Sequence, residues 1–163
     1  MKIYKAVVWL VVALAILLVV LLAGVRLFGL TPYTVLSGSM EPAYKVGSVI
    51  YVTKVDPSTL KVKDPITFVL DGTTVTHRII EIEEKGGLRF YTQGDANNTP
   101  DGGFVTPEEV IGKPVFHIPL LGYISYYVQH PPGLYIVVGA VLVLVILSFL
   151  QPVEEEKTEK TEN

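Results

Sequence analysis

The chain has 163 residues, half of them hydrophobic, and a formal net charge of −3 at pH 7. This length suits one domain of modest size, and the high apolar share indicates membrane segments rather than a wholly soluble protein. Because the sequence has no cysteine, disulfides, thiolate nucleophiles and cysteine metal sites are excluded, and the weak negative charge argues against a nucleic-acid partner.

The first expected element is a transmembrane helix at 6–26, after a short cytosolic N-terminus at 1–5. Residues 6–25 carry no charge, and a helix of about 20 residues spans about 30 Å, the thickness of a bilayer's hydrocarbon core. The alternative is a cleaved signal peptide, since Lys2 and Lys5 form a basic start. Its apolar core would exceed the usual length of about 7–15 residues, and no A-x-A site follows, so we favour an uncleaved anchor.

The orientation of the chain in the membrane follows from its basic residues. Two lysines precede the first apolar stretch, whereas only Arg26 follows it closely before Lys45. Since positive charge favours the cytosolic side, the sequence predicts a cytosolic N-terminus and an extracytoplasmic domain at 27–132.

Within this domain, β-branched and aromatic runs bounded by Gly, Pro and Asp predict a small, mostly β fold with hairpins. The expected elements are strands at 46–55 and 66–70, an Asp-Gly turn at 71–72 that opens another strand, a Gly-Gly turn at 86–87, a strand at 88–93, a polar loop at 94–103, a helical turn at 106–110, and a strand with an apolar approach to the membrane at 111–128.

A second uncharged stretch, at 133–150, has 18 residues and just reaches the length of a membrane span. The tail at 151–163 carries five acidic residues and two lysines, while the rest of the chain has eleven of each sign. We therefore expect a β domain flanked by two transmembrane helices, with an acidic, disordered tail and both termini in the cytosol.

Serine protease chemistry needs a hydroxyl, a base and usually a group that orients the base, together with donors for the oxyanion. Three histidines are candidate bases. His130 precedes the second apolar stretch in a proline-rich turn, His117 lies among apolar residues, and His77 lies in the middle of an expected strand. Each is more typical of a structural histidine, and no lysine shows an evident buried setting that would make it a base.

The polar loop "GDANNTPDGG" holds Asp95 and Asp101. A calcium loop would need glycine at its sixth position, where Pro100 stands, and glutamate at its twelfth, where Thr106 stands. We therefore predict no metal site. Aspartate is common in turns, so residue type alone does not separate a role in a site from a role in a turn for these two residues.

The combination of motifs is more specific than any one of them. "SGSMEP" at 37–42 follows an anchor closely, "HRI" at 77–79 comes later, and "GDANNTPD" at 94–101 follows that. Together they resemble the type I signal peptidase family, and within it the archaeal and endoplasmic-reticulum branch. "GSVIYV" and "IGKPVFHIPLLGY" are also similar, so the resemblance covers residues 5–150.

The resemblance implies a β-rich catalytic domain that removes signal peptides from exported preproteins without a cofactor or a metal. By position in the motif, Ser39 is the expected nucleophile and Ser37 an oxyanion donor. His77 stands where bacterial members carry a lysine base, so the serine–lysine mechanism is not carried over. Asp101 is expected to orient His77, with Asp95 as a supporting acid.

These expected roles are chemically consistent. Imidazole loses its proton around neutral pH, so His77 can accept the Ser39 proton, and the Ser39 N–H can donate to the oxyanion beside Ser37. Arg78 is expected to pair with a nearby acid. The apolar segment at 27–36 is expected to touch the lipid surface and to line shallow subsites. The substrate-binding candidates, by family position, are Tyr33, Val35, Leu36 and Met40.

The partners expected from this reading are preprotein signal peptides, the lipid bilayer and the protein translocation machinery. Two alternatives remain open. One is a non-catalytic membrane-anchored β module, such as a translocon accessory or envelope-binding domain. The other is a related peptidase for dedicated envelope substrates, such as surface-filament subunits. A binding module gives no reason for Ser37, Ser39, His77 and Asp101 to match one family's motifs together.

Overall fold

The computed structural model of the chain describes residues 2–22 and 24–129, together with positions 133, 135, 136, 139 and 143. It forms two compact units, Met1–Tyr126 and Tyr127–Asn163. His130, most of the second predicted membrane span and the acidic tail lie outside the described residues, so the predictions for them stay predictions. The sheet and the site described below belong to the first unit.

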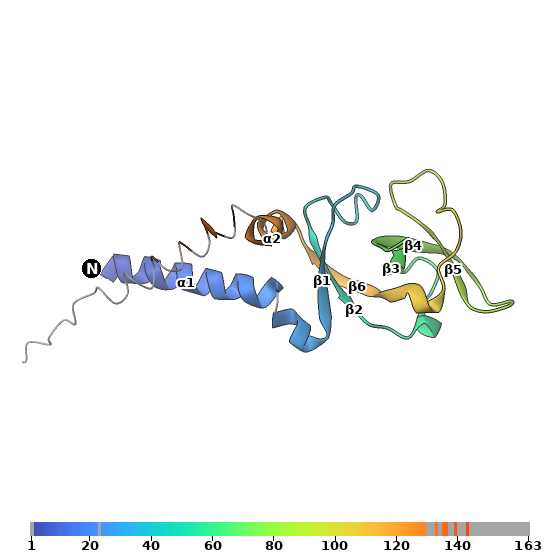
Figure 1. Ribbon diagram of the computed structural model, residues 1–163, viewed down its shortest axis with the longest axis horizontal. Coiled ribbons are helices and arrows are strands. Elements are labelled where there is room, and N and C mark those ends of the chain that lie inside the picture. The colour runs from blue at the N-terminus through green and yellow to red at the C-terminus, as the bar shows by residue number, and fades with distance from the viewer. Residues whose placement is uncertain are drawn as a thin grey trace, which may run out of the picture. The chain divides into compact units, whose positions relative to one another are not determined.

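The first unit is built around one six-stranded antiparallel sheet, so the prediction of a small β-rich domain is confirmed (Figure 1). β6 lies in the middle of the strand order β1-β2-β6-β3-β4-β5 and joins the two halves of the sheet. The strands are β1 (Leu30–Thr34), β2 (Val49–Thr53), β3 (Pro65–Leu70), β4 (Thr73–Glu83), β5 (Arg89–Gln93) and β6 (Val110–Ile118).

Helices are few and mostly short. They are α1 (Lys2–Leu22), α2 (Leu121–Gln129) and the 3-10 turns η1 (Gly24–Phe28), η2 (Pro57–Thr59) and η3 (Pro107–Glu109). The turn η3 was predicted from the sequence, and a reciprocal capping box between Thr106 and Glu109 begins it. In the part of the chain that the structure describes, no helix combines the length and the apolar character needed to cross a membrane.

The strands predicted inside the domain are confirmed as β2, β3, β4 and β5. The β3–β4 hairpin closes through Asp71 and Gly72, whose φ angles of 49° and 77° are both positive, as a type I′ turn requires. Gly86 and Gly87, also with positive φ, lie between β4 and β5. Local turn chemistry therefore sets the pairing of the three strands that carry much of the site.

Two elements differ from the prediction. β1 was not predicted, because the apolar segment that contains it was assigned to membrane contact; its Pro32 is tolerated because β1 is an edge strand. The stretch at 111–128 was predicted as a strand followed by an apolar approach to the membrane; the strand β6 ends at Ile118, and α2 begins at Leu121. Leu120 has a φ of 65°, outside the range of a strand, so the chain turns there before the helix begins.

Side-chain alternation on β4 and β5 places polar groups next to the core. Phe90 and Thr92 are buried on the same face of β5, and His77 and Ile79 are buried on one face of β4. Ile79 and Thr92 are direct cross-strand partners. One apolar cluster around these strands contains Leu60, Ile66, Phe68, Ile79, Phe90 and Val105, and a second contains Val25, Val49, Tyr51 and Leu121.

Candidate active site

A cleft of about 720 Å³ lies between the end of β1 and the start of β4. Part of its lining comes from residues 33–37, the turn that follows them and Ile50 of β2. The rest comes from the stretch 73–77. The lining residues are Tyr33, Thr34, Val35, Leu36, Ser37, Ser39, Met40, Tyr44, Ile50, Thr73, Thr74, Val75, Thr76 and His77.

The two serines lie on a turn that a buried methionine anchors. Met40 is 2% exposed, and its carbonyl accepts a hydrogen bond from the Tyr44 N–H at 2.8 Å. The Ser37 side chain is exposed and Ser39 is half-buried, and their hydroxyl oxygens are 3.2 Å apart. The turn therefore presents both hydroxyl groups at the cleft.

The polar loop at 94–103 contacts the backbone of this turn. The Ala96 N–H donates to the Ser39 carbonyl oxygen at 2.9 Å. A Cβ on Gly94 would lie 2.6 Å from the same oxygen, closer than real contacts allow. The loop thus fixes the backbone of Ser39, and only a glycine fits at position 94.

His77 forms a short hydrogen bond with Asp101. Its Nδ1 lies 2.6 Å from Asp101 Oδ2, and the two side chains are 11% and 19% exposed. Since a carboxylate only accepts hydrogen bonds, the Nδ1 of His77 carries the proton, and the lone pair of a neutral ring lies on Nε2. The Phe68 ring, with its centroid 6.5 Å from that of the imidazole, packs against it edge to face.

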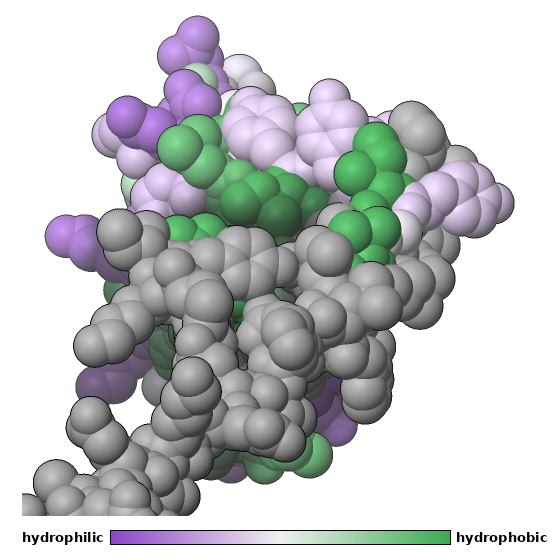
Figure 2. All heavy atoms as spheres, turned by 90° about the vertical axis from the view of Figure 1, so that its left-hand side faces the viewer, coloured by the Kyte–Doolittle hydropathy of each residue, from purple (hydrophilic) through white to green (hydrophobic). Residues whose placement is uncertain are grey.

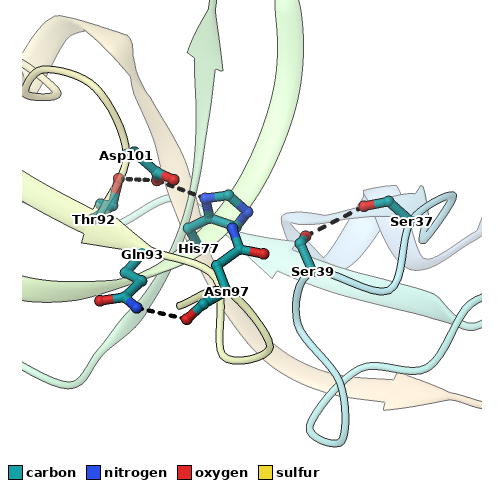
Figure 3. A network of polar contacts seen from close by, with 7 residues as sticks. All are labelled: Ser37, Ser39, His77, Thr92, Gln93, Asn97 and Asp101. Carbon is teal, nitrogen blue, oxygen red and sulfur yellow. Dashed lines mark hydrogen bonds and ion pairs between the residues drawn. The ribbon is translucent and has the colours of Figure 1, made fainter. Parts of the chain in front are cut away.

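The imidazole of His77 lies between Asp101 on one side and Ser39 on the other, as Figure 3 shows. Ser39 and His77 both line the cleft. The hydroxyl of Ser39 bonds to Ser37, and no described hydrogen bond joins it to His77. Such bonds are often long in enzymes without substrate and tighten when substrate binds.

Arg78, the next residue along β4, forms a second ion pair with the polar loop. Its Nε and Nη2 donate to the two carboxylate oxygens of Asp95 at 2.7 and 2.6 Å, and its Nη1 donates to the Lys63 carbonyl at 2.8 Å. The bonds to Asp95 raise the pKa of Arg78 above its ordinary value. Asp95 is thus the acid that the sequence analysis expected to pair with Arg78.

The four predicted substrate-binding residues, Tyr33, Val35, Leu36 and Met40, all line the cleft. Tyr44, Ile50 and the stretch 73–76 also line the cleft, and they were not predicted from the sequence. Because side chains alternate along a strand, counting back two and four residues from His77 would have placed Val75 and Thr73 on the same face of β4.

The pKa of the Tyr44 hydroxyl lies above its ordinary value. Burial raises it, the charge of Arg78 lowers it and the charge of Asp95 raises it.

Among the described residues, the other candidates for chemistry do not line the cleft. His117 is exposed on β6 and makes an edge contact with the Tyr44 ring, with centroids 5.4 Å apart. The residues that line the cleft include no lysine. Over the described ranges, no cluster of three or more His, Cys, Asp or Glu side chains is arranged to hold a metal ion.

The sequence is also similar to those of known proteins. The family model described as "Signal peptidase, peptidase S26" matches residues 6–82, which include Ser37, Ser39 and His77. The signal peptidase complex catalytic subunit sec11 of Dictyostelium discoideum is 31% identical over 125 residues, which cover 70% of this chain and 69% of that protein. This chain belongs to the peptidase S26 family of signal peptidases.

Two further relatives support the assignment. The signal peptidase complex catalytic subunit SEC11C of Homo sapiens is 29% identical over 125 residues, covering 68% of this chain and 65% of that protein. Signal peptidase I W of Bacillus subtilis (strain 168) is 46% identical over 86 residues, covering 51% of this chain and 45% of that protein. The chain thus spans about two thirds of the length of the human relative and about half of the length of the Bacillus relative. The family predicted from the sequence motifs is confirmed.

Proposed function

We propose that this S26 family member is a membrane-anchored serine endopeptidase that removes N-terminal signal peptides from exported preproteins. One observation carries the proposal: His77 binds Asp101 through Nδ1 at 2.6 Å and lines the same cleft as Ser39. This arrangement supports the proposed roles of Ser39 as nucleophile, His77 as base and Asp101 as the group that orients the base. Membership of the signal peptidase family supports the choice of substrate.

In the proposed reaction, the Ser39 hydroxyl oxygen attacks the carbonyl carbon of the scissile bond while His77 Nε2 takes the hydroxyl proton. The Asp101 carboxylate stabilises the resulting imidazolium. The amide C–N bond then breaks, and His77 gives its proton to the leaving amine. The remaining ester on Ser39 is hydrolysed by a water molecule, which His77 deprotonates in turn, and the free serine is restored.

The negative oxygen of each tetrahedral intermediate needs donors. The backbone N–H of Ser39 and the Ser37 hydroxyl are the proposed pair, because both serines line the cleft and their hydroxyl oxygens are 3.2 Å apart. One such donor is typically worth about 3–4 kcal/mol of transition-state stabilisation. Since no lysine lines the cleft, the proposed base is His77.

The preprotein is proposed to lie in the cleft as an extended chain. The end of β1 and the residues after it supply Tyr33, Val35 and Leu36 to the lining, and Met40, next to Ser39 in the chain, also lines the cleft. This lining is largely apolar, which suits small apolar side chains next to the scissile bond. We assign these four residues to substrate contact.

The membrane topology proposed for the chain is an anchor at 6–26, a second span at 133–150, cytosolic termini and an extracytoplasmic domain. The uncharged run at 6–25 supports it, as does the exposure of apolar side chains such as Trp9, which is 72% exposed. Leu27 and Phe28 of η1 are also exposed. Figure 2 shows apolar side chains, in green, at the surface of the described residues. Catalysis would then occur where the cleavage site of a membrane-held signal peptide emerges.

Partner proteins are also proposed. Two of the relatives are named as catalytic subunits of a signal peptidase complex. By analogy, this chain would work beside further subunits or the protein translocation machinery, while the peptide bond is cut by its own residues.

The test is cleavage of a model preprotein by the full chain in detergent. We expect the wild type to release the mature protein with a new N-terminus at the signal-peptide junction, and Ser39→Ala to release none. A preprotein that lacks its signal peptide is the control and should stay intact. If the folded wild type cleaves no preprotein, the result favours the non-catalytic β module. If it cleaves envelope subunits alone, the result favours a peptidase for dedicated envelope substrates.

A further inference from the structure

The hydroxyl group of Thr92 donates a hydrogen bond to Asp101. The donor is Thr92 Oγ1 and the acceptor is Asp101 Oδ2, at 2.7 Å. The same carboxylate oxygen accepts the Nδ1–H of His77 at 2.6 Å, as Figure 3 shows. One oxygen atom therefore joins the imidazole to a threonine that lies outside the cleft lining.

Two donors on one oxygen restrict the rotation of the carboxylate. Oδ2 has two lone pairs, and His77 and Thr92 use both. If the carboxyl group rotated about its Cβ–Cγ bond, it would break both hydrogen bonds together. Thr92 also holds the backbone of Asp101, because its carbonyl oxygen accepts the Asp101 N–H at 2.9 Å. The acid is thus fixed at two points by one residue.

Thr92 is itself held by the core. Its side chain is 2% exposed, and its neighbour on the same face of β5, Phe90, is fully buried. Its cross-strand partner is Ile79, two residues along β4 from His77. A β-branched side chain in a strand has few rotamers. The position of the hydroxyl is therefore set by packing within the sheet and not by solvent.

We propose that Thr92 is a positioning residue for the reaction: its hydroxyl holds the Asp101 carboxylate in the orientation that His77 needs. The inference rests on the proposed function, since it assigns Thr92 to the same Ser39–His77–Asp101 arrangement. Thr92 touches no substrate in this account and acts only through Asp101.

The test compares Thr92→Val, which keeps the shape but removes the donor, with Thr92→Ser, which keeps the donor. Losing a hydrogen bond to a charged group predicts a fall in kcat of about 10- to 100-fold for Thr92→Val, with KM changed by less than about twofold. Thr92→Ser should recover most of kcat. In the background of Asp101→Asn, Thr92→Val should cause little further loss, because the two residues act together.

Thr67→Val is the matched control for loss of a buried threonine hydroxyl. Thr67 is fully buried on β3, and its hydroxyl bonds to that of Thr76 at 2.8 Å and not to Asp101. It should lower the unfolding temperature about as much as Thr92→Val and leave kcat near the wild-type value. If Thr92→Val fails to fold, Thr92→Ser still decides, since a folded Thr92→Ser with a kcat as low as that of Asp101→Asn would overturn the proposal.

Two failures are distinguishable. If the wild type cleaves, Ser39→Ala does not, and folded Thr92→Val is as active as Thr67→Val, the role of Thr92 is overturned and the proposed function stands. If the folded wild type cleaves no preprotein, the proposed function falls and the role of Thr92 falls with it.

Discussion

The carbonyl oxygen of Ser39 lies 2.6 Å from the point where a Cβ on Gly94 would stand. The Ala96 N–H donates to the same oxygen at 2.9 Å, so the polar loop and the serine turn are in direct backbone contact. The φ of Gly94 lies outside the left-handed region, so a strained backbone does not explain the glycine. Close packing against the proposed nucleophile explains it.

Gly94→Ala should therefore displace Ser39 and slow the reaction. Because a misplacement of about 1 Å can cost about 100-fold in rate, we expect kcat to fall by about 10- to 100-fold in a protein that still folds. Gly102→Ala, in the same loop, is the matched control, since a Cβ there meets nothing within 4 Å. Equal activity of the two variants in preprotein cleavage would show that the contact is unimportant.

Asp95→Asn should lower the unfolding temperature and should reduce the cleavage rate less than Asp101→Asn does. Asp95 makes two hydrogen bonds to Arg78, at 2.7 and 2.6 Å, but none to His77. Loss of a charged partner here should cost about 1–3 kcal/mol, measured as a lower unfolding temperature. Cleavage at a temperature where both variants are folded should be reduced less than in Asp101→Asn. The opposite order of the two cleavage rates would argue that Asp95, not Asp101, supports His77.

The sequence predicted those parts of the fold that local chemistry controls. The turn at Asp71 and Gly72 and the β-branched runs around it led to β3 and β4, because turn type and alternation are local properties. β1 was missed because its residues are also typical of membrane contact. α2 was missed because its apolar and aromatic residues were assigned to the approach to the membrane. Its helical form depends on the turn at Leu120 and on packing of Leu121 against the second core cluster.

For the candidate site, the motifs singled out candidate residues but not their geometry. His77 and Asp101 are 24 residues apart, and their expected pairing came from family resemblance, since strand pairing and loop path set the distance. The hydrogen bond of Thr92 to Asp101 had no local signal at all. It depends on the register that aligns Thr92 with Ile79, and register is fixed by the whole sheet.

Ser37→Ala should reduce the rate without abolishing it. The Ser37 hydroxyl is one of two proposed oxyanion donors, and the Ser39 N–H remains in the variant. We expect kcat to fall by about 10²–10³-fold with KM little changed, as for the loss of one such donor. Ser37→Thr keeps a hydroxyl and should be more active than Ser37→Ala. A rise in KM at constant kcat would instead assign Ser37 to substrate binding.

The Asp64–Lys113 ion pair should make the free energy of unfolding depend on pH in the acidic range. Burial acts to raise the pKa of Asp64, but hydrogen bonds from Lys113 Nζ at 2.5 Å and from the Lys61 N–H outweigh it, so the folded-state pKa is lowered. A carboxyl group with a lowered folded pKa stabilises the fold above its unfolded pKa, about 3.9, and the effect is lost as the pH falls through the folded value.

Thermal unfolding of wild type and Asp64→Asn checks this dependence. The pair is partly exposed, so we expect a difference of at most about 1 kcal/mol at pH 7 that shrinks as the pH falls below about 4. Lys113→Gln should give a similar loss at pH 7, and the double variant should lose less than the sum. A difference that does not change with pH would contradict the assignment.

The rate of preprotein cleavage by His77→Ala, relative to wild type, tests the central claim most directly. His77 is the proposed base for Ser39, and a positioned base contributes about 10²–10⁴-fold to the rate. We predict a loss in kcat of at least about 10²-fold in a variant that keeps the wild-type circular dichroism spectrum. Cleavage by folded His77→Ala at the wild-type rate would contradict the account.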